Sequence, residues 1–494
     1  MTSAALGSPW LHGLSENPAA PASVLVRLLG MAPAERLPFK LRLRPLPGEV
    51  IEAWARHPHP RTRREVAEHI HLTAEQRTRL LDGDVRMAYV VAMHAAHDRS
   101  ALTDEGFERL ATHPEAMVRG EIARHQRLPP GPLRLLADDP EPGVRRMVCA
   151  RAWEHLDAAE RAALLADEDE DVRAEALLCR HRDELPMGPA TYAALPDDKV
   201  RERAAEECLL TRGLAERLAR HEDTRVRCFL ARNPRLDADL VAVLGEDPYD
   251  TVRRHASVHP ALTERQRAAV RGVEVGPDDH HHPLAWVRAR HGDPDEMRRC
   301  AASGHVLLRR SAATARNLPA DVVERLAGDE DFAVRLLLAE HCAQAPAHML
   351  LEMWETWDGR SARRLPEHPN FPRAGLLRCA DDPRPRMREA ALLDPDCPPA
   401  VVDRLGRDPD EAVRRRALEH PRLSVASVVR LTGDPAWWVR NAAVRHPRLP
   451  ADVLAGLLEE PETAEAAAGS PALPETAMHA LMDRAGLPEA AQAA

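Results

Sequence analysis

The sequence contains very little lysine and few aromatic residues. Lys40 and Lys199 are the only lysines among 494 residues, and Phe, Trp and Tyr together make up 3%. A core with so few large rings is filled by Ala, Leu and Val, which suits closely packed helices. The net charge of −10 at pH 7 argues against a protein whose main task is to coat nucleic acid, because phosphate binding requires a concentrated basic surface. A local basic stripe remains compatible with this charge.

Closely spaced cysteines and long apolar runs are also missing. Without a CxxC pair, neither a zinc knuckle nor an iron–sulfur cluster is indicated, and scattered free cysteines suit a reducing compartment. The N-terminus lacks a basic start followed by an apolar run, so no signal peptide is evident. No stretch approaches the ~20 apolar residues that cross a bilayer. We therefore predict a soluble, cytoplasmic protein without a membrane association or a bound cofactor. The richness in Ala, Arg and Pro is typical of a protein from a GC-rich bacterial genome.

A Val-Arg pair, or a close substitute, recurs along most of the chain. The first residue of the pair lies at 118, 144, 172, 200, 226, 252, 308, 334, 387, 413 and 439, so that most spacings are 26 and two are 28. The gap between 334 and 387 contains a degenerate unit in which His368, Pro369, Phe371 and Leu376 keep their positions. Such units add up to about fifteen repeats, and a period in this range indicates a solenoid rather than separate domains.

Each repeat has the sequence features of a helix, a turn and a shorter helix. Asp-Pro pairs such as those at Asp408 and Asp434 open it, because Asp is a good N-cap and Pro is accepted at the first helical position. The Val that follows has apolar partners three or four residues later, which places them on one helix face. His-Pro or Asn-Pro then ends the helix, because proline disfavours the α conformation of the residue before it. The structural positions we predict on this basis are Val226, Val252, Val334, Val413, Val439, Asp408, Asp434, Pro421 and Pro447.

The repeats resemble those of the leucine-rich repeat variant family, whose unit reads "DPxxxVRxxVAxNPxLPxxxLxxL". The resemblance covers roughly residues 55–482, is strongest at 221–262 and 381–458, and is looser for HEAT-like repeats. It implies an α-helix alternating with a short 3₁₀ or α-helix in a right-handed solenoid, and no particular reaction. One branch of the family carries a cysteine-ligated 4Fe–4S cluster near its N-terminus. The first 148 residues here contain no cysteine, so this feature is not carried over.

The ends and two internal segments depart from the repeat. We predict an N-terminal cap and half-repeat over 1–54, a solenoid over 55–458 with irregular units near 263–303 and 346–366, and a degenerate C-terminal cap with an Ala-rich tail over 459–494. Terminal repeats are expected to be atypical because one of their sides faces solvent.

The Arg that follows the core Val would form a regular row along the stacked repeats. One interpretation is a cationic ladder for phosphates or an acidic partner. The other is structural: each Arg pairs with a cap Asp or a carbonyl of a neighbouring repeat, and the recurring Asp offers a bidentate partner. The structural interpretation is favoured because binding positions vary along a solenoid, whereas positions that build it recur.

Tryptophan supplies the candidate interaction anchors. Trp437 and Trp438 are adjacent in a helix and cannot share a face, so we expect one of them to be exposed beside Arg440. Trp354 and Trp357 are three residues apart and are expected to share a face. Aromatic residues beside Arg are enriched in interface hot spots, but they also fill gaps at degenerate repeats. Both interpretations stay open.

The segment Asp278 to His282, "DDHHH", has ligand types that suit zinc or nickel. It lies in an irregular stretch, and no second pair of ligands such as HExxH accompanies it, so we predict no metal site. Metal-linked sensing through this segment remains a third functional possibility. The His residues before Pro are interpreted as turn residues rather than as ligands or bases.

The leading hypothesis is a non-catalytic scaffold that binds a protein partner along an extended solenoid surface. The alternative is a nucleic-acid-binding solenoid similar to DNA-repair glycosylases of the HEAT-like class, which would use the Arg ladder. No nucleophile elbow, P-loop or dinucleotide fingerprint is present, so we expect no enzymatic activity and assign no catalytic or cofactor-binding residue.

Overall fold

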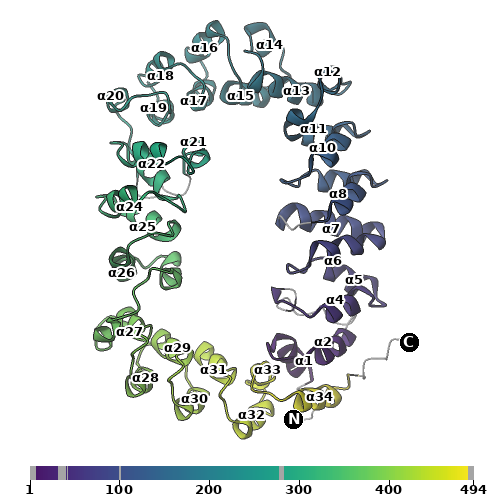
Figure 1. Cartoon of the computed structure of the whole chain (residues 1–494), viewed down its shortest axis with the longest axis vertical. Helices are drawn as coiled ribbons and strands as arrows, with labels where there is room; N and C mark the ends of the chain where they lie inside the picture. Colours follow the sequence, from purple (N-terminus) through teal and green to yellow (C-terminus); the bar gives the residue numbers. More distant parts are fainter. Residues whose placement is uncertain (1–6, 32–40, 42, 99–101, 277–282, 488–494) are drawn as a thin grey trace. The chain divides into compact units, whose positions relative to one another are not determined.

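The computed structural model describes residues 7–31, 41, 43–98, 102–276 and 283–487. Within these ranges no strand is present, and only Met187 and Leu210 form an isolated β-bridge. Short helices follow one another in pairs along the chain (Figure 1). The predicted all-α solenoid is therefore confirmed, and the chain is a helical-repeat protein.

The first helix of each regular repeat carries the Val-Arg position, and the second follows the turn. The first helices are α9 (Ala116–Ile122), α11 (Pro142–Ala152), α13 (Glu170–Asp183), α15 (Asp198–Glu207), α17 (Thr224–Arg232), α19 (Asp250–Ser257), α23 (Val306–Ala313), α25 (Phe332–His341), α27 (Pro385–Ala391), α29 (Glu411–Glu419) and α31 (Trp437–Val444). The second helices are α10 (Pro130–Ala137), α12 (Ala158–Leu165), α14 (Pro189–Ala193), α16 (Arg212–Ala219), α18 (Ala238–Leu244), α20 (Glu264–Ala269), α24 (Ala320–Ala327), α26 (Ala347–Thr356), α28 (Pro399–Leu405), α30 (Val425–Leu431) and α32 (Ala451–Leu458). These second helices are α-helical.

The remaining elements lie at the chain ends and in the irregular segments. They are α1 (Gly7–Glu16), α2 (Ala22–Leu28), η2 (Leu29–Met31), α4 (Gly48–Ala55), α5 (Pro60–Val66), α6 (Ala74–Arg79), η3 (Leu80–Asp82), α7 (Val85–Asp98), α8 (Asp104–Ala111), η4 (Trp153–His155), α21 (Ala285–Ala289), α22 (Pro294–Ala301), η5 (Arg360–Glu367), η6 (Leu376–Cys379), α33 (Ala464–Ala468) and α34 (Glu475–Arg484). In the degenerate unit between Val334 and Met387, Phe371 and Leu376 are buried. This unit therefore keeps its core positions although 3₁₀ turns replace both helices.

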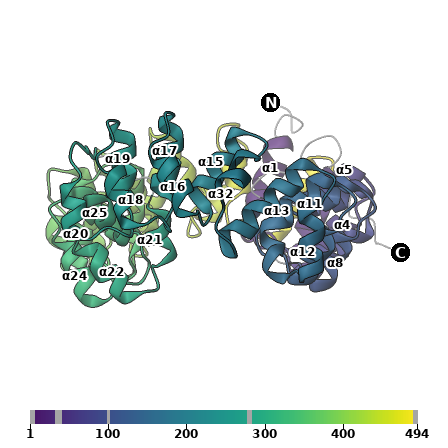
Figure 2. The same cartoon turned by 90° about the horizontal axis from the view of Figure 1, so that it is seen from above.

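The helices form two compact units. Unit 1 contains Met1–Val148 and Arg373–Ala494, and unit 2 contains Cys149–Pro372. Within unit 2, first helices pack on first helices, as α15, α17 and α19 do, and second helices such as α16 and α18 form a separate layer (Figures 1 and 2). The apolar faces of the two layers meet between them, so each repeat covers its neighbours.

The helix starts differ from the prediction at Asp408 and Asp434. The N-cap of α29 is Asp410, whose Oδ1 accepts the backbone N–H of Ala412 at 2.9 Å. Asp408 lies two residues earlier and accepts the N–H of Asp410, and Asp434 accepts that of Ala436, both at 2.9 Å. The prediction that these aspartates are N-caps was therefore wrong, because the Asp-Pro pair forms the turn that precedes the helix.

The core positions follow the predicted spacing with one exception. Val252, Val334, Val413 and Val439 have no exposed surface. Val226 is only partly buried, and the centre of its repeat is formed by other residues of α17, including Leu230. The turn prolines Pro421 and Pro447 are exposed in turns just beyond the first helices, as expected of residues that end a helix.

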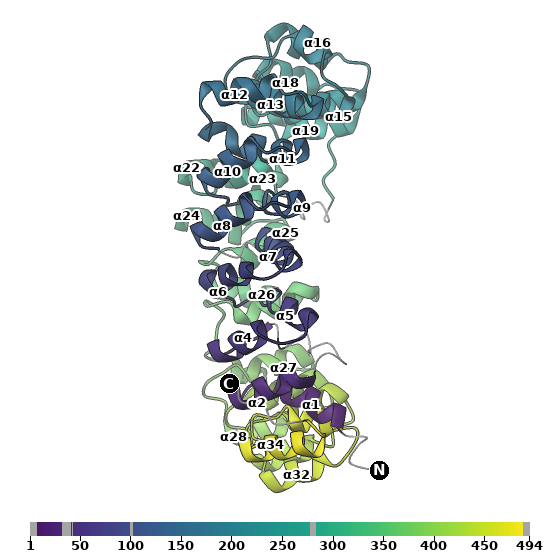
Figure 3. The same cartoon turned by 90° about the vertical axis from the view of Figure 1, so that its right-hand side faces the viewer.

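The two ends of the chain pack against each other within unit 1. Helix α1 packs on α33 and α34, and α2 packs on α34 (Figures 1 and 3). The Asn17 amide donates to the carbonyls of Ala468 and Ser470 at 3.0 and 2.7 Å. Asn233 uses the same arrangement between ordinary repeats, where it donates to the carbonyls of Ala205 and Cys208. The N-terminal half-repeat thus takes the place of the next repeat after α33 and α34.

The approach of α1 to α33 is unusually close. A Cβ at Gly13 would lie 2.1 Å from the carbonyl oxygen of Glu465, so only glycine fits there. The Trp10 ring is fully buried and its Nε1 donates to the Leu458 carbonyl at 2.9 Å. Arg27 pairs with Asp483 at 2.5 Å. We expected each terminal repeat to expose one side to solvent, but here the two ends cover each other.

Candidate interaction site

The Arg row is held by the backbone of its own repeat. Each Nη1 donates to the carbonyl oxygen six residues earlier, in the turn before the helix, over distances from 2.5 to 3.2 Å. This bond is present for all eleven predicted ladder residues: Arg119, Arg145, Arg173, Arg201, Arg227, Arg253, Arg309, Arg335, Arg388, Arg414 and Arg440. A guanidinium that satisfies turn carbonyls stabilises the start of its helix, which explains why the Arg recurs.

Five of these arginines also bridge to the next repeat. Each forms a bidentate pair with an Asp 20 residues later, with Nε to Oδ2 distances of 2.6 to 2.7 Å: Arg119–Asp139, Arg227–Asp247, Arg309–Asp329, Arg388–Asp408 and Arg414–Asp434. The backbone carbonyl of that same Asp accepts from the next Arg, as Asp434 accepts from Arg440 at 2.7 Å. The result is a chain of hydrogen bonds that links consecutive turns.

The electrostatics of these pairs agree with the geometry. The hydrogen bond to Asp434 raises the pKa of Arg414, against the effect of burial. Burial acts to raise the pKa of Asp434, but its hydrogen bond with Arg414 and a backbone N–H outweigh this and the pKa is lowered. Both groups are therefore charged at neutral pH. The structural interpretation of the ladder is confirmed at these positions, and Arg440 is its last predicted member.

The His residues before Pro connect neighbouring repeats. His259 Nε2 lies 2.6 Å from the carbonyl oxygen of Asn233, and His368 Nε2 lies 3.0 Å from that of Cys342, in each case 26 residues earlier. Their Nδ1 atoms accept backbone N–H groups two residues later. An imidazole whose Nδ1 accepts carries its proton at Nε2, where it can donate to the carbonyl of the neighbouring repeat. These histidines are turn residues, as predicted.

Trp437 and Trp438 form an exposed aromatic pair at the start of α31. Their exposed fractions are 62% and 41%, so both are exposed rather than one as we expected. The two rings meet edge to face, with centroids 5.9 Å apart. Arg440 lies one turn further along and is held by the carbonyls of Asp434 and Pro435. Among the four candidate tryptophans, this pair is exposed.

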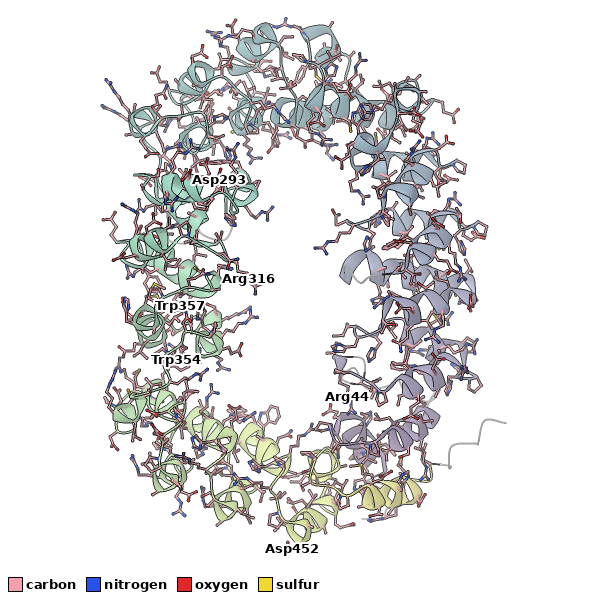
Figure 4. The ribbon with its side chains drawn as sticks, in the orientation of Figure 1. Arg44, Asp293, Arg316, Trp354, Trp357 and Asp452 are labelled. Atoms are coloured by element: carbon pink, nitrogen blue, oxygen red, sulfur yellow. The ribbon has the colours of Figure 1, made fainter. Side chains whose placement is uncertain are left out.

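The other two tryptophans of the candidate set, Trp354 and Trp357, do not share a helix face. Trp354 lies inside α26 (Figure 4) and is 3% exposed. Its ring packs edge to face on Phe371. Trp357 follows the end of α26 with an extended backbone and is half-buried. Trp354 was therefore wrongly predicted as an anchor, because its ring fills the core of a degenerate repeat. Trp357 remains accessible from one side.

Neither a metal cluster nor a membrane span was found in the residues that the structure describes. Across those ranges, no three His, Cys, Asp or Glu side chains are grouped as a metal ion requires. The segment Asp278 to His282 lies outside the described residues. No helix in the described ranges combines the length and the apolar character that crossing a bilayer requires.

Comparisons with known proteins add little beyond the repeat itself. A solved structure described as a leucine-rich repeat variant with a novel repetitive protein structural motif is 22% identical, with 51% of this chain and 88% of that chain covered and a TM-score of 0.29. An engineered protein is 12% identical over 98% of this chain and 99% of its own, with a TM-score of 0.11. No protein-family model and no curated protein match the sequence. Neither TM-score supports an argument, so the assignment to a helical-repeat protein depends on the geometry described above.

Proposed function

We propose that this chain is a non-catalytic scaffold that binds a protein partner, with Trp437 and Trp438 as its anchor. The observation that carries the proposal is their joint exposure on a helix whose preceding turn is held by ladder hydrogen bonds. Large aromatic side chains that stay in solvent on a rigid support are typical hot-spot residues. In this proposal the regular repeats supply the support and the partner covers the aromatic pair.

A nucleic-acid partner has less support. The eleven ladder arginines donate to turn carbonyls, so the row that would bind phosphates is already engaged. The net charge of −10 disfavours a polyanion further. An acidic nucleic acid would have to compete with five bidentate carboxylates that are already in place.

The proposal also includes the family and the cellular compartment of the protein. Membership of the leucine-rich repeat variant family is supported by the repeated Asp-Pro, Val-Arg and His-Pro positions, each with a defined bonding role. A cytoplasmic setting is supported by the eight cysteines, all of which are free thiols and seven of which are buried.

The test uses the full chain as bait for cross-linking and quantitative mass spectrometry in lysate of the source organism. The double variant Trp437→Ala/Trp438→Ala should lower the recovery of a specific partner at least tenfold, since a hot-spot aromatic contributes about 2 kcal/mol or more. Met117→Ala is the matched control, because Met117 is an apolar residue in the same unit that is also 62% exposed. Equal recovery with the double variant and the wild type would contradict the assignment of the anchor.

The nucleic-acid alternative has a direct test. Fluorescence anisotropy with a labelled DNA duplex should detect no saturable binding at micromolar protein. Submicromolar binding that weakens steeply between 50 and 200 mM salt, as phosphate contacts do, would overturn the choice of a protein partner.

A further inference from the structure

Unit 2 contains a pocket whose lining does not include the tryptophan pair. Its volume is about 600 Å³, within the range of small-ligand sites. The lining comes from α21, α25 and η5, from residues beside α21, and from the residues that follow α23 and α26. Leu336 and Leu337 are buried and supply an apolar floor.

Trp357 forms an aromatic wall of this pocket, and its ring is held from two sides. Its Nε1 donates to the Ser361 hydroxyl at 2.8 Å. The ring also lies directly over Gly359, where a Cβ would be 2.1 Å from a ring carbon. A glycine at 359 is therefore what allows the ring to take this position. Phe332 supports the ring further, with centroids 5.8 Å apart.

The charged residues of the pocket favour an anion. Arg288 and Arg360 both line it, against the single carboxylate of Glu340. Within the described residues, neither guanidinium has an ion pair or a side-chain hydrogen bond. This contrasts with the ladder arginines, which are all bonded.

His291 does not change this balance at neutral pH. His291 lines the pocket, and its Nε2 lies 3.2 Å from the carbonyl oxygen of Ser311. Burial lowers its pKa, the Ser311 carbonyl opposes this, and the nearby Arg288 and His341 lower it further. The His291 ring is therefore neutral at pH 7, and the two arginines dominate the charge of the site.

We propose that this pocket binds an anion that carries a flat apolar group, that is, an aromatic carboxylate. The ring would lie against Trp357 and the leucine floor, and the carboxylate would reach Arg288 and Arg360, which match carboxylate geometry. The same chemistry is offered by a free small acid and by the C-terminal residue of a peptide. This site is independent of the proposed anchor at Trp437 and Trp438.

The full chain is titrated with N-acetyl-L-phenylalanine, and binding is measured by calorimetry or ligand-observed NMR. The expected dissociation constant is about 0.1 to 1 mM, in line with the ligand efficiency of a molecule of this size. N-acetyl-L-phenylalaninamide, which lacks the charge, should bind at least tenfold more weakly. Equal affinity for the acid and the amide, or no binding below about 10 mM, would overturn the proposal.

Variants identify the residues that are responsible for ligand binding. Arg288→Ala and Arg360→Ala should each weaken binding about tenfold, and Gly359→Ala should abolish it by displacing the Trp357 ring. Arg316→Ala is the matched control, because Arg316 is an exposed arginine of the same unit that does not line the pocket. Loss of binding in Arg316→Ala equal to that in the pocket variants would contradict the assignment. Each variant is first compared with the wild type by thermal unfolding, so that a folding defect is recognised.

A second titration distinguishes the two sources of the carboxylate. A hexapeptide that ends in Phe with a free carboxylate is compared with N-acetyl-L-phenylalanine and with the amidated peptide. Tighter binding of the free-carboxylate peptide identifies a chain terminus as the ligand, and equal or weaker binding identifies a free acid. A peptide that binds equally well when amidated would contradict the site chemistry.

Discussion

The junction between α29 and α31 and the junction between α33 and α1 perform the same task with different residues. At the first, Arg414 and Asp434 form a bidentate pair at 2.7 Å, and the sequence repeats this pair elsewhere. At the second, no Val-Arg pair is present in α33 or α1. There, Asn17 amide bonds, a buried Trp10 and a steric fit at Gly13 hold the two ends together.

The difference shows what a repeated motif contributes. A regular junction is stabilised by groups that recur at other junctions, as the five Arg–Asp pairs do. The chain-end junction uses side chains that fit only each other, and its Arg445–Glu16 pair at 2.7 Å has no counterpart one repeat earlier, where Glu419 pairs with Arg416 instead. Changes at the two junctions should therefore have separable effects.

The largest effect is expected when a charge is placed in the core of the regular junction. Val413→Asp puts a carboxylate where the side chain has no exposed surface. Burial of an unpaired charge should lower the free energy of unfolding by about 3–5 kcal/mol, measured by urea denaturation. Val425→Asp, at an exposed valine that begins α30, should change it by less than about 0.5 kcal/mol. If both variants behave alike, the register of the core positions is incorrect.

Gly13→Ala should break the chain-end junction. Alanine normally stabilises a helix relative to glycine by about 1 kcal/mol, but here its Cβ would meet the Glu465 carbonyl oxygen at 2.1 Å. The helices must separate, and we expect a loss of about 3 kcal/mol with faster hydrogen exchange in α1 and α33 but not in α29. Gly456→Ala is the matched control, because a Cβ there meets no atom within 4 Å. It should be neutral or slightly stabilising, and a stabilised Gly13→Ala would show that the ends do not pack in solution.

Asp434→Asn should weaken the regular junction by about 2 kcal/mol. The substitution removes the charge that pairs with the buried Arg414 but leaves the turn carbonyls that also bind this guanidinium. Thermal unfolding and hydrogen exchange in α29 and α31 measure the effect. Asp452→Asn, at an exposed position in the first turn of α32, should cost less than about 0.5 kcal/mol.

Mild acid should distinguish the two junctions through a pH-dependent change in stability. Burial lowers the pKa of His420 and His446 at regular junctions. Burial also lowers the pKa of His255 and His305, in their case to about 4. Asn17, at the junction of the chain ends, does not titrate. The unfolded chain therefore binds more protons than the folded chain below about pH 6.5, so stability is fully present above that pH and falls as the pH drops toward 4. We expect a loss of about 2 kcal/mol for each of His255 and His305 between pH 7 and pH 5.

The measurement is urea denaturation across that pH range. His305→Asn keeps a side chain that can cap α23, where His305 accepts the N–H of Leu307, but removes the titrating group. This variant should show a shallower dependence of stability on pH. An unchanged slope would mean that His305 is protonated equally in the folded and unfolded chains.

Most of the fold could be predicted from the sequence, because repeat positions act locally. Val413 was assigned to the core from its spacing, and the Arg–Asp pair was anticipated as the structural role of the ladder. The Asp408 and Asp434 caps were misplaced by two residues, since an Asp-Pro turn and an Asp N-cap have the same local sequence signature. The exposure of both Trp437 and Trp438 was not predicted because helix periodicity does not reveal whether neighbouring repeats reach far enough to cover a large ring.

The pocket in unit 2 and the chain-end junction were missed for a related reason. Asn17-Pro18 was visible as half of a repeat, and the match with Asn233-Pro234 was a usable signal for its bonding. The sequence contained no sign that its acceptors lie more than 450 residues away. Arg288 belongs to a Val-Arg pair that falls outside the regular spacing, and Arg360 belongs to no such pair, so no pattern connected them with Trp357.

The sequence alone determined the helical repeat and the bonds inside it, because a 26-residue spacing brings the same side chains to the same neighbours each time. The tertiary structure decided which arginines lack a side-chain partner among the described residues, which tryptophans remain in solvent and what covers the chain ends. Those outcomes depend on contacts between residues that share no period, and their energies arise only once the repeats are stacked.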